Sequence, residues 1–249
     1  MINLINKKCI ILVIASRGEF YDQFINILWK KLIDIIEEKY SRLFKIYLIF
    51  GKTSINKLHI NKKNILKFNI RETLKPGILD KTLQAFEYVN NKYNYKYIYR
   101  TNLSSFLNIE LFNNMLDTIT DDFTYLGRLN ENRKIRRHKI NKYISYISGS
   151  CILLSKSACN YILKNKHKLD RKKLPDDVAI GEIMPSKISK PYYQIETYNT
   201  KLFSNELLNK MLKEIDIGKY YYIRIKNIKN RNIDVQLIKK FLSYFYNIT

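Results

Sequence analysis

Three groups of polar side chains stand where the sequence predicts that buried strands end, and they carry residue types that could do chemistry. They are Ala15-Ser16-Arg17, residues 100–105, and Ser148-Gly149-Ser150 with the nearby Pro175-Asp176-Asp177. In open α/β sheets, ligands bind at the carboxyl ends of the strands. We therefore expect these groups to form the functional site.

Asp176 and Asp177 are the candidates for acid–base chemistry. They follow Pro175 at an expected helix start, where a carboxylate caps exposed N–H groups and is stabilised by the helix dipole. Capping alone would explain one of the two carboxylates. We therefore predict a division of labour in which Asp177 acts as general base toward a hydroxyl of a substrate, while Asp176 organises the helix start or holds that substrate.

Cations near the expected strand ends are candidates for binding phosphate. Arg17, Arg100, Arg224 and Lys226 can each form charge-assisted hydrogen bonds to a phosphate group. The alternative for residues 100–105 is a plain Asn/Ser turn at a strand end, although such a turn does not require an arginine beside it.

Small residues form the third group. Ser148, Gly149 and Ser150 either leave room for a sugar or mark a bend in a buried strand, where glycine permits close backbone approach. The sequence has no Ser/His/Asp or Cys/His pattern that would indicate nucleophilic catalysis.

The three groups resemble, in order, three motifs of galactosyltransferase-like and fringe-like β-1,3-glycosyltransferases. Arg100-Thr101-Asn102-Leu103-Ser104-Ser105-Phe106 is similar to their K-T-D-D-D-V-F element. Residues 148–155 resemble their S-G-x-G-Y-x-L-S strand, and residues 175–181 resemble their P-D-D/E-D-V-x-x-G element. The order of elements agrees over residues 9–246, and the chain also resembles glycosyltransferase-like proteins of large DNA viruses.

The resemblance implies a glycosyltransferase with the A-type (GT-A) fold that moves a sugar from a nucleotide diphosphate donor to a hydroxyl of a glycan or glycoprotein, with inversion. The donor-binding residues expected from this resemblance and from the cations at the strand ends are Ala15, Ser16, Arg17, Arg100, Thr101, Asn102, Ser104, Arg224 and Lys226. The residues expected on the acceptor side are Ser148, Gly149, Ser150 and Asp176.

One departure from the family motif concerns the metal. The first and third aspartates of the family's D-x-D, which bring the metal ion, are replaced by Asn102 and Ser104. These are weak ligands for a hard cation. The sequence therefore favours an enzyme that requires no metal cofactor and offsets the leaving-group charge with arginine and lysine. A site for manganese or magnesium is the alternative.

Strands and helices are expected to alternate, which indicates an α/β fold with a mostly parallel central sheet flanked by helices. We expect strands over residues 9–15, 44–50, 64–68, 95–99, 122–127, 144–154, 192–197 and 220–225. Helices are expected over residues 20–40, 76–89, 111–116, 156–164, 175–184 and 235–245, and an exposed loop over 128–143. The 249 residues are expected to form a single domain, with the nucleotide-sugar-binding half at about 1–127 and the acceptor-side half at about 128–249.

The basic composition keeps two other function classes open. A formal charge of +23 raises nucleic acid as a partner, although the abundance of Lys, Asn, Ile and Tyr offers a purely compositional explanation. A nucleic-acid-binding protein is therefore one alternative. A catalytically inactive, glycosyltransferase-like carbohydrate-binding module is the other.

The cysteine count and the apolar runs indicate a compartment. Cys9, Cys151 and Cys159 are odd in number and lack metal-binding spacing, which argues against both a disulfide framework and a zinc site. Residues 9–15 are too short for a convincing signal peptide, and no run reaches the roughly 18 to 20 apolar residues of a membrane span. We expect a soluble cytoplasmic protein, in the host cytoplasm if the chain is viral.

Overall fold

The computed structural model describes residues 4–52, 59–60, 64–137, 140–185, 220–226 and 231–248. Its contacts group into two compact units, each assembled from separate segments of the chain. The first unit takes residues 1–16, 40–102 and 121–193, and the second takes residues 17–39, 103–120 and 194–249. The sequence-based division into a single domain with two halves stays a prediction.

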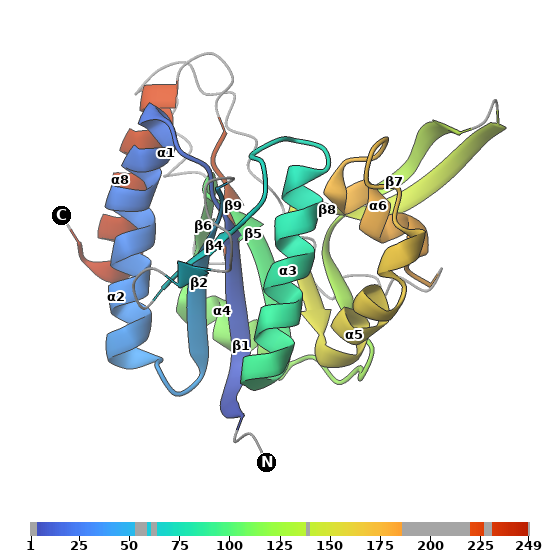
Figure 1. The fold of residues 1–249 in the computed structure, drawn as a ribbon. Helices are drawn as coiled ribbons and strands as arrows, with labels where there is room; N and C mark the ends of the chain where they lie inside the picture. Colours follow the sequence, from blue (N-terminus) through green and yellow to red (C-terminus); the bar gives the residue numbers. More distant parts are fainter. Residues whose placement is uncertain are drawn as a thin grey trace. The chain divides into compact units, whose positions relative to one another are not determined.

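The first unit is built on a sheet. In the described part of the chain it has seven strands in the order β3-β4-β2-β1-β5-β8-β7, and Figure 1 shows the ribbon. The strands are β1 (Ile5–Ile14), β2 (Phe44–Gly51), β3 (His59–Ile60), β4 (Ile65–Phe68), β5 (Tyr93–Asn102), β7 (Tyr125–Arg137) and β8 (Ile140–Ser155). The central strands β4, β2, β1 and β5 run parallel, while β3, β8 and β7 are antiparallel to their neighbours. The predicted α/β class, with a mostly parallel central sheet flanked by helices, is confirmed.

Strand β1 is apolar along its second half because both of its faces are buried. Residues Cys9 to Val13 are each 0% exposed, which is typical of a parallel strand covered on both sides. Ile10, Leu12 and Ile14 belong to one core cluster with residues of three helices. Those helices are α3 (Gly77–Lys92), α5 (Lys156–Lys164) and α6 (Asp176–Ile183), and α3 and α5 lie in front of the strands in Figure 1.

The strand order creates a switch point between β1 and β5. From β1 the chain proceeds to β2 and β4 on one side and then crosses by way of α3 to β5 on the other side. Ile14 is opposite Asn102 in this pairing, so the carboxyl ends of the two strands meet at one edge. Such a switch point is where open α/β sheets bind ligands.

The expected loop over residues 128–143 is a wrong prediction. Strand β7 continues to Arg137 and pairs with β8 from Ile140 onward, with irregular register after Gly127 and again after Asn130. A ladder of this kind is formed by backbone hydrogen bonds between the strands, so its formation does not require the alternation of apolar and polar side chains on which the prediction relied.

The second unit combines a long helical segment with a small sheet. It holds α1 (Glu19–Phe24), a π-helical segment (Ile25–Trp29), α2 (Lys30–Lys39), β6 (Ser105–Leu107), α4 (Ile109–Asp117), β9 (Tyr222–Arg224) and α8 (Arg231–Tyr246). Strands β6 and β9 pair antiparallel. Trp29 is fully buried and its Nε1 donates to the carbonyl oxygen of Leu103 over 3.0 Å, which ties the π-helical segment to the turn before β6.

The remaining helix and strand predictions agree with the structure within a few residues, except that the strand expected at 192–197 lies outside the described residues. None of the helices in the described ranges is long and apolar enough to cross a membrane. The cytoplasmic location stays a prediction.

Gly127, at the bend of β7, generates a stability prediction. Its φ is +151°, and a Cβ there would collide with the carbonyl oxygen of Cys151 and the side chain of Ile147. Strained backbone of this kind costs about 1–3 kcal/mol, and the collision adds to it. We expect Gly127→Ala to lower the free energy of unfolding in urea by more than about 3 kcal/mol.

Gly18 provides the matched control. Its φ of +143° is similarly strained for other residues, but the nearest atom to its Cβ position is 3.7 Å away. Gly18→Ala should therefore lower the free energy of unfolding only by the backbone strain. Equal losses of free energy in the two variants would show that the structure around Gly127 shifts to avoid the collision and would contradict the prediction.

Candidate active site

Two ion pairs of the first unit lie at the carboxyl edge of the sheet. The first joins Arg100, near the end of β5, to Asp176, the first residue of α6, through Nη2 and Oδ2. Arg100 is 3% exposed and Asp176 is 6% exposed. Burial raises the pKa of Asp176, and the Arg100 charge works in the opposite direction. Sequence reasoning placed both residues in the site but did not pair them.

The pairing changes the expected role of Arg100. Its guanidinium is engaged by a carboxylate, and Nε has no hydrogen-bond partner among the described residues. A buried arginine held in this way supports the start of α6 and is not presented on an open surface. Direct binding of the donor diphosphate by Arg100 stays a prediction that the geometry does not favour.

Gly149 on β8 is required by this ion pair. A Cβ at Gly149 would overlap Nη1 of Arg100 and come within 3.3 Å of Cβ of Asp177. The close approach explains the Ser-Gly-Ser sequence better than a bend does. Thr101 Oγ1 donates to the Ser150 carbonyl over 2.7 Å, which joins the end of β5 to the middle of β8, and the Ser148 and Ser150 hydroxyls are 3.0 Å apart.

Asp177 lies beside this pair and is half-buried. Its Oδ2 accepts from the Gly149 N–H, and its Oδ1 accepts from the Val178 N–H, both over 2.9 Å. The first bond fixes the carboxylate against β8. Because a carboxylate oxygen carries two lone pairs, Oδ2 can accept a second hydrogen bond from a hydroxyl. The structure therefore places Asp177 against Gly149, between Ser148 and Ser150 in the sequence. The acceptor-side role of these three residues and of Asp176 stays a prediction, as does the role of Asp177 as base.

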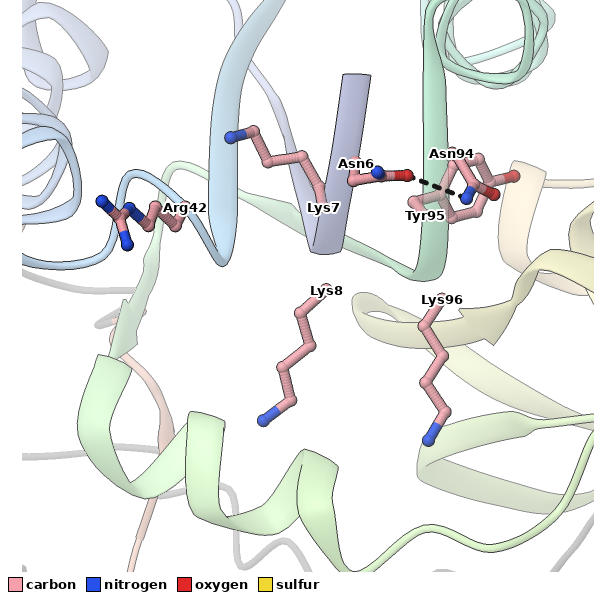
Figure 2. A pocket seen from close by; sticks show the side chains of 7 residues that line it. All are labelled: Asn6, Lys7, Lys8, Arg42, Asn94, Tyr95 and Lys96. Carbon is pink, nitrogen blue, oxygen red and sulfur yellow. Dashed lines mark hydrogen bonds between the residues drawn. The ribbon is translucent and has the colours of Figure 1, made fainter. Parts of the chain in front are cut away.

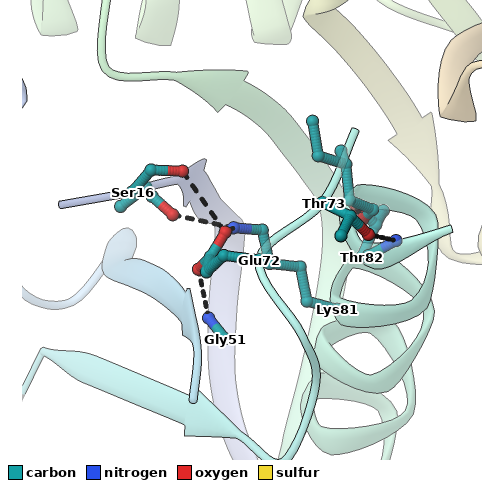
Figure 3. Close-up of polar contacts among 9 residues, drawn as sticks. Ser16, Gly51, Glu72, Thr73, Lys81 and Thr82 are labelled. Carbon is teal, nitrogen blue, oxygen red and sulfur yellow. Dashed lines mark hydrogen bonds and ion pairs between the residues drawn. The ribbon is translucent and has the colours of Figure 1, made fainter. Parts of the chain in front are cut away.

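The second ion pair was missed by sequence reasoning. Lys81 of α3 is fully buried, and its Nζ donates to the Ala15 carbonyl over 2.7 Å and to both carboxylate oxygens of Glu72 over 2.7 and 3.0 Å. Glu72 also accepts from the Gly51 N–H and from the Ser16 hydroxyl, the latter over 3.3 Å. Figure 3 shows these contacts around the ends of β1 and β2.

The sequence carries no clear signal for this pair. Lys81 stands two positions from both Leu79 and Leu83, so helical periodicity directs it away from the face that those leucines share, although the structure buries all three. The predicted donor residues Ala15 and Ser16 are brought together with Glu72 and Lys81.

Other predicted donor residues belong to the second unit. The Ser104 hydroxyl accepts from Nη2 of Arg231 over 3.0 Å, and Nη1 of Arg224 is 3.4 Å from the Ser105 hydroxyl. Arg231 was not predicted. Its Nη1 also pairs with the buried Asp234 over 3.1 Å, and its side chain is 19% exposed. Two guanidinium groups thus approach the Ser104-Ser105 turn.

Arg17 and Lys226 are exposed residues of the same unit. Arg17 forms an ion pair with Asp22 over 2.8 Å, and its side chain is 65% exposed. Asn102 ends β5 in the first unit and is half-buried. The structure leaves the donor roles of these three residues as predictions.

The residues that replace the family's D-x-D aspartates do not fit a divalent metal ion. The Asn102 amide and the Ser104 hydroxyl are neutral ligands, and the Arg231 charge beside Ser104 would repel a cation bound to that hydroxyl. Within the described ranges, no three His, Cys, Asp or Glu residues gather closely enough to hold a metal.

A basic pocket lies at the opposite edge of the sheet, and Figure 2 shows the side chains that line it. It has a volume of about 420 Å³ and is lined by Asn6, Lys7, Lys8, Arg42, Asn94, Tyr95 and Lys96. These residues come from the amino-terminal parts of β1 and β5 and from the turn before β2. Four cations and no carboxylate line it, so an anion could bind there, and the nucleic-acid alternative stays a prediction for this surface.

Comparisons with known proteins identify a family for this chain. The galactosyltransferase family model matches residues 59–193, which is more than half of the 249 residues. Among solved structures, the chain is similar to a mutant of Drosophila β-1,4-galactosyltransferase 7 in complex with manganese, UDP-Gal and xylobiose. That similarity has 12% sequence identity and a TM-score of 0.41, and it covers 91% of this chain and 79% of that chain. A comparison with curated protein sequences finds no match.

The Arg100–Asp176 pair generates a stability prediction. Asp176→Asn leaves the buried guanidinium without a carboxylate, and removing one member of a buried pair typically costs about 3–5 kcal/mol. We expect a loss of this size in the free energy of unfolding in urea. The double variant Arg100→Met/Asp176→Asn should recover part of it.

Asp170→Asn serves as the control, because the Asp170 carboxylate accepts from the Lys173 N–H at an exposed turn. It should cost less than about 1 kcal/mol, in line with a capping bond that asparagine also makes. A loss for Asp176→Asn no larger than that for Asp170→Asn would contradict a stabilising role of the buried pair.

Proposed function

Since the chain belongs to the galactosyltransferase family, it is a glycosyltransferase that uses a nucleotide-sugar donor, and we propose that it transfers the sugar to a hydroxyl of a glycan or glycoprotein by a single inverting displacement. The observation that carries this proposal is the carboxylate of Asp177, held against β8 by the Gly149 N–H. An inverting transfer requires one such base beside the acceptor.

The displacement needs few groups. The acceptor oxygen attacks the anomeric carbon while the bond from that carbon to the diphosphate oxygen breaks. The hydroxyl proton passes to Asp177, and the diphosphate leaves with its negative charge. The chain must therefore provide one base, a means of orienting the two substrates, and positive charge for the leaving group.

We assign the leaving-group charge to arginine and not to a metal. Arg231 and Arg224 approach the hydroxyls of Ser104 and Ser105, which follow Asn102 along the chain. Arginine offers a fork of donors that matches phosphate geometry. The manganese in the Drosophila enzyme structure has no counterpart in this proposal, because Ser104 and Asn102 replace the expected carboxylates.

Donor binding provides the direct test of the activity. A ligand that binds the native state raises its melting temperature by mass action, so a panel of nucleotide sugars, with the free nucleotides as references, identifies the donor. The best donor is then incubated with glycan acceptors, and the transfer product is analysed for its anomeric configuration. A retained configuration would contradict the inverting mechanism, and the absence of any nucleotide-sugar binding would contradict the proposed function.

Removal of the base gives the first kinetic prediction. Asp177→Asn preserves the shape and most of the capping ability of the side chain, so the melting temperature should change little. Loss of a general base typically lowers the rate about 100- to 10,000-fold. We expect kcat for transfer from the identified donor to fall by this factor while donor affinity stays within about twofold.

Asp170→Asn is again the matched control and should retain full activity, since Asp170 lies at an exposed turn outside the site. Normal turnover in a folded Asp177→Asn protein would show that Asp177 only caps α6.

The metal question gives the second prediction. Because Asn102 and Ser104 are poor ligands and Arg231 supplies positive charge beside Ser104, chelator should leave donor affinity and turnover nearly unchanged. By contrast, Arg224→Gln should weaken donor binding by about 1.5–3 kcal/mol, the range for a hydrogen bond to a charged group. Calorimetric titration with and without chelator measures both effects. Loss of binding on chelation that manganese restores would refute the arginine assignment.

A further inference from the structure

Lys81 and Glu72 form a built polar site at the ends of β1 and β2. All three protons of the Lys81 ammonium are accepted, by the Ala15 carbonyl and the two oxygens of Glu72. A fully buried ammonium without such partners would be very costly. Burial lowers the pKa of Lys81, while Glu72 acts in the opposite direction. The lysine therefore has no donor left for a ligand, and its effect is to fix the position of Glu72.

Glu72 differs from its partner in exposure. Its side chain is 34% exposed, whereas that of Lys81 is 1% exposed. One side of the carboxylate is thus held by the lysine and by the Gly51 N–H, and the other side is open to solvent beside the Ser16 hydroxyl. A carboxylate with a fixed position and an open side is suited to receive hydrogen bonds from a ligand, because little further ordering is needed.

The charge of Glu72 selects the part of a donor that could bind there. A phosphate would be repelled, whereas a vicinal diol presents two neutral O–H donors to the two carboxylate oxygens. A nucleotide sugar carries such diols on its ribose and on its transferred sugar. The two sources have the same hydrogen-bonding chemistry, so their positions relative to the base must decide between them.

The distance along the sheet favours the ribose. Glu72 is bonded at the ends of β1 and β2, while Asp177 is bonded to Gly149 of β8. In the sheet order, β5 lies between β1 and β8, and neighbouring strands are about 4.8 Å apart. Roughly 10 Å therefore separates the end of β1 from β8, and roughly 14 Å separates the end of β2 from β8, which leaves room for a diphosphate and a sugar between the ribose and the base.

We propose that Glu72, fixed by Lys81, is a specificity residue that accepts hydrogen bonds from the ribose 2′- and 3′-hydroxyls of the donor nucleotide. This inference rests on the proposed function. It adds a residue and a selectivity: the protein prefers ribonucleotide to deoxyribonucleotide donors, and Lys81 acts as a positioning residue through Glu72.

The test compares the affinity of the full chain for a ribonucleotide and its 2′-deoxy counterpart by calorimetry. UDP, GDP and ADP are titrated first, and the tightest of them is paired with its 2′-deoxy form. We expect the wild-type protein to bind the ribonucleotide about tenfold more tightly or better, the effect of one hydrogen bond to a charged group. Equal affinity for the two nucleotides would overturn the proposal.

The variant must remove the carboxylate without leaving a buried charge. Glu72→Gln/Lys81→Met replaces both members of the pair, which is often nearly neutral for stability. It should reduce the ribose preference to about twofold or less. Glu87→Gln, on the same helix as Lys81 but in an exposed pair with Lys166, is the matched control and should keep the wild-type preference. A double variant that folds and retains the full preference would also overturn the proposal.

Titrations of the double variant with the nucleotide sugar and with the free nucleotide distinguish the ribose from the transferred sugar as the group that Glu72 binds. If Glu72 binds the transferred sugar instead, the double variant will keep the ribose preference and lose the difference in affinity between the nucleotide sugar and the free nucleotide. If no nucleotide of the panel binds the wild-type protein, the proposed function fails and the ribose site fails with it. Nucleotide binding without ribose preference would overturn the ribose site alone.

Discussion

Each of the two cations buried at the carboxyl edge of the sheet, Lys81 and Arg100, has to be matched by a carboxylate, because an unpaired charge in the interior costs several kcal/mol. Much of the local architecture follows from this requirement. Asp176 must begin α6 where Arg100 can reach it, Gly149 must lack a side chain so that the guanidinium fits, and the segment before α3 must bring Glu72 back to the ends of β1 and β2. Burial lowers the pKa of Lys81, and the more distant charges of Arg100 and Asp176 act on that pKa in opposite directions.

The pairing also determines which charges remain for substrate. Lys81 and Arg100 are internally compensated, and the exposed carboxylates of the first unit favour neutral or hydroxyl-bearing partners. The two arginines at the Ser104-Ser105 turn of the second unit are more exposed. The excess of basic residues in the chain therefore does not translate directly into positive charge at the sheet edge, and each cation has to be judged by its own partners.

The fold could largely be predicted from sequence because buried strands such as β1 are continuous apolar runs and α5 has a clear amphipathic period. The β7–β8 hairpin could not, since backbone pairing sustains it without a side-chain pattern. At the site, the motifs located Asp176, Asp177 and Gly149 correctly at one place. They did not reveal that Arg100 is occupied by Asp176, that Arg231 reaches Ser104, or that Glu72 pairs with Lys81. Such partnerships join residues between 9 and 127 positions apart, and a single sequence contains no measure of that proximity.

The buried Trp29 has a practical value for spectroscopy. It is the chain's single tryptophan, and its indole donates to the Leu103 carbonyl at the turn that continues into Ser104 and Ser105. Selective excitation at the red edge of the absorption band avoids the 20 tyrosines, so the emission reports on one environment. The emission wavelength and lifetime of this indole therefore follow any rearrangement of the turn, and the natural protein carries its own optical label there without a dye or an introduced residue.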